Sequence, residues 1–440
     1  MFTTYNEALG WIHGRLRLGI KPGLTRMEWM MEKLGHPELK MKTVHIGGTN
    51  GKGSTVTFLR SILEAAGYSV GTFTSPYIEQ FNERISVNGK PISDEEILEL
   101  TNVIAPLADE LEETELGGPT EFEVITAMSF YYFANVNQVD IVLYEVGLGG
   151  RFDSTNIIQP IASVITNIGL DHTNILGHTY GEIAFEKAGI IKEQIPVFTA
   201  VKNQDAINVI KEQADKKHAS LFILNQDFSI TSHCPQETGE VFTLSSDNHL
   251  FEQLEISMIG QHQTENAALA VMAAQSINSH EEFVISEDAI RTGLKKAYWP
   301  GRLEILSKNP LVIIDGAHND EGISALVHEL SNRYSNNTIH IVFAALKDKK
   351  LDKMIAQLDQ VADEISFVSF DFPRAAEAVD LFSLSHSKNK RIGVQWDSYL
   401  AKCIHNLKPD SILVVTGSLY FISEAKPYLS EFLKNNKISL

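Results

Sequence analysis

Residues 47–54 carry the strongest chemical signal in the sequence, Gly47-Gly48-Thr49-Asn50-Gly51-Lys52-Gly53-Ser54. They follow the β-branched run 43–46 and precede an amphipathic stretch, 54–66, which is the strand–loop–helix context of a phosphate-binding loop. Glycines allow backbone N–H groups to turn toward phosphate oxygens, and a helix N-terminus favours negative charge. We expect Lys52 to bridge the β and γ phosphates and the Ser54 hydroxyl to reach Mg²⁺.

The spacing of this loop departs from the strict G-x-x-x-x-G-K-[ST] form. Only two residues separate Gly48 from Gly51, and Gly53 stands between Lys52 and Ser54. This variant argues against ordinary GTPases and motors. The sequence also lacks the N-K-x-D motif of a GTPase and the L-S-G-G-Q motif of an ABC-type ATPase.

Three other predicted strands end in possible metal ligands. Strand 69–74 ends at Ser75, strand 139–146 carries Glu145 near its end, and strand 161–166 leads to Asp171 and His172. Ligands of open α/β sheets bind outside the carboxyl ends of the strands, so these groups are expected near the phosphates. Hydroxyl, carboxylate and imidazole groups can hold one or two divalent cations.

Two further motifs have both a functional and a purely structural interpretation. Lys187 lies in a predicted helix, 179–191, where the residue pattern alone favours a solvated lysine. Residues 315–319, Asp-Gly-Ala-His-Asn, follow strand 311–314. They could face a nucleotide, or they could cap the helix that follows.

The elements that position these residues predict an α/β fold. Nearly continuous apolar strands indicate a mainly parallel sheet covered on both faces. Residues 1–40 are expected to be helical, and residues 220–257 to form a small β-rich excursion. Further helices are predicted at 94–113, 122–135, 204–218 and 264–278, and further strands at 340–345, 365–370 and 411–415. Pro300-Gly301 breaks the pattern before this second α/β series, so we expect domains at 1–298 and 299–440, with a hinge at Pro300-Gly301.

Composition narrows the function further. The chain has 440 residues, 43% of them hydrophobic, and a formal net charge of −19. Such a charge argues against a broad basic surface for nucleic acid. The two cysteines, Cys234 and Cys403, are expected to be free thiols. Neither a signal peptide nor an apolar membrane span is apparent, so a cytoplasmic protein is expected.

The ordered motifs resemble those of the folylpolyglutamate synthase/dihydrofolate synthase family, which is related to the Mur peptide ligases. The resemblance spans nearly the whole chain and is carried by GIKPGLTRMEWM, HIGGTNGKGST, TSPYIEQFNERISVNG, EVGLGGRFDSTN, NIGLDHTNILG, AFEKAGIIK, GQHQTENAALA, WPGRLEIL, DGAHN and TGSLY. It implies a P-loop ATPase domain followed by a smaller Rossmann-like domain. One departure is Tyr77, because the family usually has histidine after Ser-Pro.

The resemblance also implies roles for individual residues. ATP would be bound by Gly48, Thr49, Asn50, Gly51, Lys52, Gly53, Ser54, Asn266, Arg302 and Asp315. Two Mg²⁺ sites would use Ser54, Ser75, Glu145, His172 and Lys187, with Lys187 carbamylated. We also expect Lys187 to be buried beside Gly189 and Phe185, which would favour the neutral amine that carbamylation needs. Lys52, Lys187, His172 and His318 would be catalytic, and Tyr77, Arg84 and Ser418 would contact substrate.

The implied reaction is ATP-dependent ligation of L-glutamate to the γ-carboxylate of a folate, through an acyl phosphate, in folate biosynthesis and one-carbon metabolism. Dihydrofolate synthesis from dihydropteroate, or both activities, remains open, as does the preferred folate form. The expected partners are these small molecules, with no nucleic acid or membrane, and the protein is expected to be a monomer. A non-catalytic nucleotide-binding module is disfavoured because Glu145, His172 and Lys187 are all present.

Overall fold

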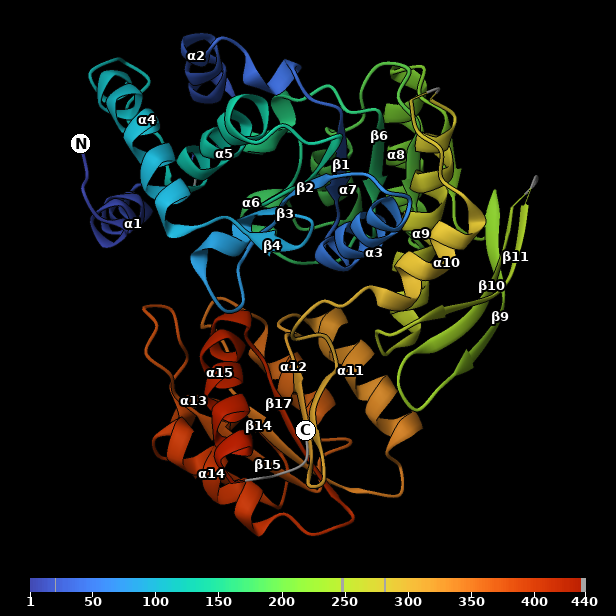
Figure 1. Ribbon diagram of the computed structural model, residues 1–440. Helices are drawn as coiled ribbons and strands as arrows, with labels where there is room; N and C mark the ends of the chain where they lie inside the picture. The colour runs from blue at the N-terminus through green and yellow to red at the C-terminus, as the bar shows by residue number, and fades with distance from the viewer. Residues whose placement is uncertain (20, 247–248, 281, 437–440) are drawn as a thin grey trace. The chain divides into compact units, whose positions relative to one another are not determined.

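The computed structural model describes residues 1–19, 21–246, 249–280 and 282–436. The chain divides into two compact units (Figure 1). Unit 1 comprises Met1–Cys234, Val241–Ser257 and Gln263–Ala297. Unit 2 comprises Tyr298–Leu440 together with two short segments from earlier in the chain, Pro235–Glu240 and Met258–His262.

Unit 1 is built on an eight-stranded sheet with the order β4-β3-β2-β5-β1-β6-β7-β8. The six strands from β2 to β8 in this order are parallel, and β3 and β4 are antiparallel additions at one edge. The strands are β1 (Thr43–Gly47), β2 (Val70–Phe73), β3 (Ile85–Val87), β4 (Lys90–Pro91), β5 (Ile141–Glu145), β6 (Ala162–Ile165), β7 (Val197–Thr199) and β8 (Leu221–Ile223).

Helices cover both faces of this sheet, which explains why its strands are apolar throughout. Side chains of α1, α2, α4 and α5 share one core with β2 and β5, and those of α7 and α8 share another with β6, β7 and β8. Besides α9, which is described below, the α-helices of unit 1 are α1 (Tyr5–Gly14), α2 (Thr25–Leu34), α3 (Lys52–Ala65), α4 (Asp94–Glu112), α5 (Glu121–Tyr131), α6 (Thr173–Leu176), α7 (Tyr180–Ala188), α8 (Gln204–Lys216) and α10 (Glu287–Lys296). Its short 3-10 helices are η1 (Arg15–Leu18), η2 (Pro37–Leu39), η3 (Phe81–Arg84) and η5 (Ser154–Ile157).

The predicted β-rich excursion is present as a separate three-stranded sheet, visible beside α10 in Figure 1. Its strands are β9 (Phe228–Pro235), β10 (Glu240–Ser246) and β11 (His249–Ile256). The helix predicted at 264–278 begins slightly earlier, as α9 (Gln261–Asn278). The helix predicted at 122–135 ends sooner, because the chain changes to a π-helical turn, η4 (Tyr132–Val136).

Unit 2 is a six-stranded sheet with the order β12-β13-β17-β14-β15-β16. All neighbours are parallel except β12, which pairs antiparallel with β13. Its elements are β12 (Glu304–Lys308), β13 (Leu311–Asp315), α11 (Asp320–Arg333), β14 (Thr338–Phe343), α12 (Leu351–Leu358), β15 (Glu364–Val368), α13 (Ala378–Leu384), β16 (Lys390–Gly393), α14 (Trp396–Asn406), β17 (Ser411–Thr416) and α15 (Leu419–Asn435).

The two faces of the unit 2 sheet bury alternate residues of the same strands. Ile313 packs with side chains of α11, α12 and α13, whereas Val312 and Ile314 pack with those of α14 and α15. This alternation reflects the two-residue period of a strand between two layers of helices. The predicted α/β fold, with a mainly parallel sheet and a second α/β unit, is confirmed.

Arg333, on α11, joins the early segments to the rest of unit 2. Its guanidinium pairs with the carboxylates of Glu240 and Glu329, and both carboxylates are buried. The same two carboxylates accept backbone N–H groups from Gly260, at 2.5 Å, and Gln261, at 2.8 Å. Residues far apart in sequence are therefore fixed together by one charged cluster.

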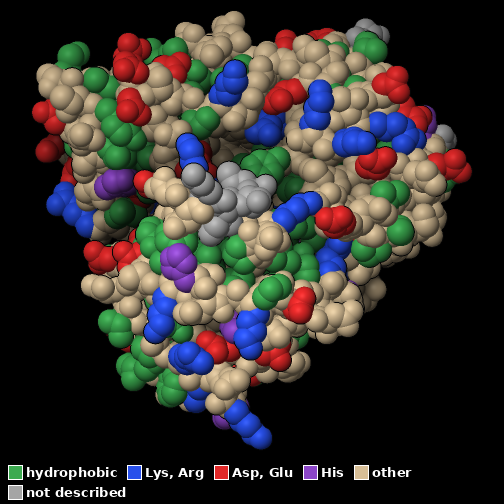
Figure 2. All heavy atoms as spheres, turned by 60° about the horizontal axis from the view of Figure 1, so that its bottom comes forward, with side chains coloured by type: hydrophobic (Ala, Val, Ile, Leu, Met, Phe, Trp, Pro, Cys, Tyr) green, Lys and Arg blue, Asp and Glu red, His purple; other side chains and the backbone are tan. Residues whose placement is uncertain are grey.

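The surface carries both signs of charge. On the face drawn in Figure 2, acidic side chains lie interspersed with Lys and Arg. Among the described residues, no helix is both long enough and apolar enough to cross a membrane.

Candidate active site

The glycine loop connects β1 to α3, as predicted. Gly48 has φ +143 and Gly51 has φ +83, values that favour glycine because it has no Cβ. Space is also short: a Cβ at Gly48 would lie 1.8 Å from Thr166 Oγ1. In the described structure Gly51 is the N-cap of α3 and provides no side-chain hydrogen bond. The helix therefore begins with its dipole directed at the loop and without a side-chain cap from its N-cap residue.

A second loop, following β6, holds the glycine loop in shape. The backbone carbonyl of Asn167 accepts the Thr49 N–H at 3.0 Å. Its side-chain Oδ1 accepts the Asn50 N–H at 2.8 Å. The Thr166 hydroxyl donates to the Asn50 carbonyl at 2.5 Å, and the Gly169 N–H donates to Thr49 Oγ1 at 2.9 Å. Sequence reasoning missed Thr166, Asn167 and Gly169. Only the strand order, which places β6 beside β1, identifies them.

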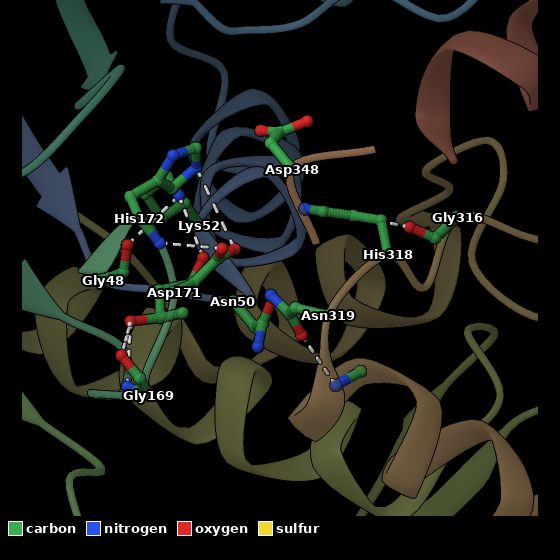
Figure 3. Close-up of polar contacts among 12 residues, drawn as sticks. Gly48, Asn50, Lys52, Gly169, Asp171, His172, Gly316, His318, Asn319 and Asp348 are labelled. Carbon is green, nitrogen blue, oxygen red and sulfur yellow. Dashed lines mark hydrogen bonds and ion pairs between the residues drawn. The ribbon is translucent and has the colours of Figure 1, made fainter. Parts of the chain in front are cut away.

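Two lysines converge on one carbonyl of the loop. Lys52 Nζ donates to the Gly48 carbonyl at 3.1 Å and to that of Thr49 at 3.2 Å (Figure 3). Lys187 Nζ donates to the same Gly48 carbonyl at 2.9 Å, and its residue is 4% exposed. Burial, reinforced by the charge of Lys52, lowers the pKa of Lys187 to about 7. A substantial fraction of Lys187 is therefore a neutral amine near neutral pH.

The solvated interpretation of Lys187, which the residue pattern favoured, is wrong. Phe185, which was expected beside Lys187, also has another neighbour. Phe185 is 40% exposed and lies against the guanidinium of Arg151, 4.8 Å from ring centre to Cζ. Lys187 is buried because the Gly48 loop covers it, a contact that the local helical pattern cannot reveal.

Glu145 and Ser75 meet at the carboxyl edge of the same sheet. Glu145 lies opposite Ile46 in the β1–β5 register, and its carboxylate is buried with 4% exposure. The backbone N–H of Ser75 donates to Glu145 Oε2 at 3.1 Å. Ser54, in the first turn of α3, is also buried. Buried carboxylate and hydroxyl oxygens are donors that suit a hard cation such as Mg²⁺.

His172 follows β6, but Asp171 is the less exposed of the pair. The His172 side chain is 41% exposed, against 10% for Asp171. Its ring Nε2 lies 3.9 Å from Asp171 Oδ2, a pair marked by a dashed line in Figure 3. Asp171 also opposes the lowering of the Lys187 pKa, so its charge reaches that amine. Within the described residues, no group of three or more His, Cys, Asp or Glu side chains is placed to hold a metal.

Asn266 is brought to the glycine loop, as the resemblance implied. A Cβ at Gly51 would lie 2.3 Å from Asn266 Oδ1, and Asn266 Nδ2 donates to Gln263 Oε1 at 3.0 Å. Tyr77 and Arg84 also lie together: the Arg84 guanidinium carbon is 5.4 Å from the Tyr77 ring centre. Arg84 Nε is buried and has no hydrogen-bond partner in the described structure.

In unit 2, Arg302, Asp315 and His318 gather around Gly316. Asp315 ends β13 and accepts backbone N–H groups from Leu303, at 2.8 Å, and Ala317, at 2.9 Å. Burial raises the pKa of Asp315, against the opposing charge of Arg302 and these two N–H donors. His318 Nδ1 lies 2.8 Å from the Gly316 carbonyl (Figure 3).

Ser418 is the N-cap of α15 at the end of β17, the strand beside β13. It is buried, with 2% exposure, and the next residue approaches the same loop: a Cβ at Gly316 would lie 2.3 Å from Leu419 Cδ2. Four of the predicted site residues, Arg302, Asp315, His318 and Ser418, therefore surround the loops after β13 and β17.

Comparison with known proteins identifies the group to which this arrangement belongs. Residues 46–274 match the Mur ligase middle domain, and residues 301–419 match the Mur ligase glutamate ligase domain. The dihydrofolate synthase/folylpolyglutamate synthase of Bacillus subtilis (strain 168) is 50% identical over 430 residues, which cover 98% of this chain and 100% of that protein.

Solved structures agree with this assignment. Mycobacterium tuberculosis folylpolyglutamate synthase complexed with ADP has a TM-score of 0.89 at 29% identity, covering 96% of this chain and 98% of that one. An FPGS–AMPPCP–folate complex has a TM-score of 0.81 at 32% identity, covering 97% of this chain and 100% of that one. The chain therefore belongs to the Mur ligase family, within its group of folylpolyglutamate and dihydrofolate synthases.

Proposed function

We propose that this ATP-dependent ligase joins the α-amine of L-glutamate to the γ-carboxylate of a reduced folate. The observation that carries the proposal is the glycine loop with two lysines on one carbonyl, in a chain related over its whole length to folate-glutamate ligases. Transfer of the γ-phosphoryl group of ATP to the folate carboxylate gives an acyl phosphate and ADP. Attack by the glutamate amine then forms the amide, and the amine proton and phosphate leave.

A second function, dihydrofolate synthesis, differs only in the acceptor. There the first glutamate is joined to the carboxylate of dihydropteroate by the same chemistry. It is favoured by one observation: the Bacillus subtilis relative, 50% identical to this chain, is named for both activities. We infer that one site serves both acceptors.

In this proposal the glycine loop supplies the main contacts to the phosphates of ATP. Lys52 would exchange its present carbonyl partners for phosphate oxygens and offset the charge that develops on the transferred phosphoryl group. The remaining ATP ligands would be Gly48, Thr49, Asn50, Gly51, Gly53, Ser54, Asn266, Arg302 and Asp315. His318 would act on the reacting groups from the loop after β13.

Mg²⁺ would be held at two sites by Ser54, Ser75, Glu145, His172 and Lys187. The buried oxygens of Glu145 and Ser54 fit such a cation, which would neutralise phosphate charge when bound. The protein's own part is positioning. The Ser75 N–H donates to one oxygen of Glu145 and so holds this carboxylate in place at the end of β5.

The proposed form of Lys187 is a carbamate. Its neutral amine would attack CO₂, forming an N–C bond and releasing a proton, so that a cation becomes an oxygen donor. The pKa of about 7 supplies that neutral amine, and the carbamate N–H could still donate to the Gly48 carbonyl. NMR with isotope-labelled bicarbonate tests this directly. Lys187→Ala should lose activity and regain part of it in acetate, and an unmodified amine in the active enzyme would disprove the carbamate.

Substrate contacts are proposed at Tyr77, Arg84 and Ser418. The guanidinium of Arg84 lies over the rings of Tyr77 and Phe81, which hold it in place. Its buried Nε has no hydrogen-bond partner in the described structure, so this donor is available to a substrate carboxylate. Ser418 lies in unit 2 at the start of α15, where it would contact the amino-acid substrate.

The decisive experiment measures ADP release with each substrate omitted in turn. ADP should require both an acceptor, either a reduced folate or dihydropteroate, and L-glutamate, with one phosphate released for each amide formed. Rapid hydrolysis without an acceptor, equal turnover with GTP, or a preference for a UDP-muramoyl peptide would overturn the proposal. Comparing the two pterin acceptors distinguishes the two functions.

We further propose a cytoplasmic monomer with a domain boundary at 298/299. The boundary is supported by the gap between the two matched Mur ligase regions, which end at 274 and resume at 301. Sedimentation of the purified chain tests the monomer.

A further inference from the structure

The carboxylate of Glu304, at the start of β12, makes three contacts inside unit 2. Its Oε2 accepts the backbone N–H of Gly301 at 2.7 Å. Its Oε1 accepts the hydroxyl of Tyr298 and lies 3.2 Å from Nζ of Lys426, on α15. The side chains of Glu304 and Lys426 are only 9% and 10% exposed. These groups tie residues 298–304, the segment that enters unit 2, to its last helix.

The other side of the same segment is fixed by the loop after β13. The Gly301 carbonyl accepts from the N–H of Gly316 at 2.8 Å and from Arg302 Nη1 at 3.1 Å. The Leu303 N–H donates to Asp315 Oδ2 at 2.8 Å. Arg302 is thus held between two anchored residues, and its guanidinium is directed at Gly316, where a Cβ would lie 2.4 Å from Nη1.

The hydrogen bonds of Glu304 are suited to a fixed geometry. Partial burial, with the hydrogen bond to Glu304 and its charge, raises the pKa of Tyr298 to about 12, so its phenol is a donor near neutral pH. A carboxylate that accepts one N–H and one O–H beside an ammonium has its main lone-pair directions satisfied. Such a group holds its neighbours in one arrangement, because moving Lys426 leaves a buried charge unpaired and moving either neutral donor removes a hydrogen bond from a buried carboxylate.

We propose that Glu304 is a positioning residue for ATP binding: it holds Gly301 so that the guanidinium of Arg302 is presented to the nucleotide. Glu304 itself does not contact ATP. The proposal rests on the role given above to Arg302 as a nucleotide ligand. It predicts that the effect of Glu304 on nucleotide affinity passes entirely through Arg302.

The main test is a double-mutant cycle with the KM for ATP and the Kd for ADP as readouts. Arg302→Ala and Glu304→Leu should each raise both constants about tenfold, with kcat changed less. In the Arg302→Ala background, Glu304→Leu should add no further loss. Additive losses, or a fall in thermal stability with unchanged constants, would make Glu304 merely structural and overturn the proposal.

Conservative variants sharpen the test. Glu304→Gln keeps an oxygen within reach of the Gly301 N–H and should keep near-native constants, although loss of the charge beside the buried Lys426 ammonium should lower thermal stability. Glu304→Asp moves the carboxylate away from the Gly301 N–H and should weaken nucleotide binding. It replaces Glu304→Leu in the double-mutant cycle if the leucine variant does not fold. The matched control is Glu364→Leu, which breaks another unit 2 ion pair, with Arg391 at 2.9 Å, away from the Gly316 loop. Its constants should match the parent.

ADP affinity, measured without folate or glutamate, separates this proposal from the proposed ligase activity. If ADP binding responds as described but no ligation occurs, the ligase function fails and the positioning role stands. If Arg302→Ala leaves ADP affinity unchanged, the positioning role fails whatever the enzyme ligates.

Discussion

The loops after β1 and β13 differ in how each is held, although both run from a parallel strand through glycine to a helix. In the first, 47–54, the backbone is held by residues of another strand end, and α3 begins without a side-chain cap in the described structure. In the second, 315–319, the carboxylate of Asp315 holds the loop, and Asn319 Oδ1 caps α11 by accepting the Gly322 N–H at 2.9 Å.

The difference indicates which helix terminus is available to an anion. An uncapped N-terminus keeps its backbone donors and dipole directed outward, whereas a side-chain oxygen at the cap already occupies that position. The loop after β1 is therefore suited to phosphate, and the loop after β13 to presenting side chains. The capping interpretation of residues 315–319 is confirmed at Asn319.

The largest effect is expected at Lys187, whose amine is buried against the first loop. Its pKa is about 7 when folded and 10.5 in the unfolded chain, so the unfolded state holds the proton between these values. The free energy of unfolding of the parent should therefore rise with pH from about 7 to 10.5. Lys187→Met should be more stable by on the order of 4 kcal/mol below pH 7, and equally stable near pH 10.5.

Denaturant titrations of both proteins across this pH range, in bicarbonate-free buffer, make the measurement. A stability difference that is independent of pH would show that Lys187 is not a buried amine in the folded protein.

The next effect is on catalysis, at Lys52. Lys52→Ala should reduce kcat/KM on the order of 10²-fold or more, because the mutation removes the cation that offsets the negative charge of the transferring phosphoryl group. Thermal denaturation should show an intact fold. Near-native activity of Lys52→Ala would mean that the nucleotide binds elsewhere, and the loop after β1 could no longer be distinguished from the loop after β13 as the phosphate site.

A smaller effect is expected from the support beneath the first loop. Thr166→Val removes the hydroxyl that donates to the Asn50 carbonyl and should raise the KM for ATP about tenfold, at a stability loss of ~1 kcal/mol. Thr199→Val is the matched control, since its hydroxyl donates to the Ile165 carbonyl at 2.7 Å in the same sheet. If both variants change the KM for ATP equally, the Thr166 hydrogen bond has no specific role in supporting the glycine loop.

The smallest effect is expected at the cap of the second loop. Asn319→Ala should lower the free energy of unfolding by about 1 kcal/mol, the usual value of an N-cap, and change the KM for ATP less than Thr166→Val does. Asn203→Ala, which uncaps α8, provides a comparison for stability alone. A larger KM effect at Asn319 than at Thr166 would reverse the comparison.

Local sequence patterns were sufficient for many of the elements and for the first loop. The glycines, Lys52 and Ser54 are adjacent in sequence, and β1 and α3 flank them where the apolar pattern changes period. The antiparallel edge strands β3, β4 and β12 were not predicted, and neither were the parallel strands β7 and β16. They are short, and β12 follows the Pro-Gly break that marked the boundary.

The remaining parts of the site depend on strand order and could not be read locally. The roles of Thr166 and Asn167 require β6 to lie beside β1, and the burial of Lys187 requires the Gly48 carbonyl. Asn266 was predicted only from the family resemblance, because nothing in the sequence of an alanine-rich helix indicates which of its residues lies against Gly51.

The Arg333 cluster limits how this chain can be divided or recombined. A gene fragment that begins at 298 or 299 would encode Arg333 and Glu329 without Glu240, Gly260 and Gln261, their partners in the folded unit. Such a fragment would expose a buried cation and an unmatched helix surface. Exchange of the C-terminal region between relatives therefore has to carry 235–240 and 258–262 with it, so the module that evolution can move is larger than the contiguous sequence that appears to define it.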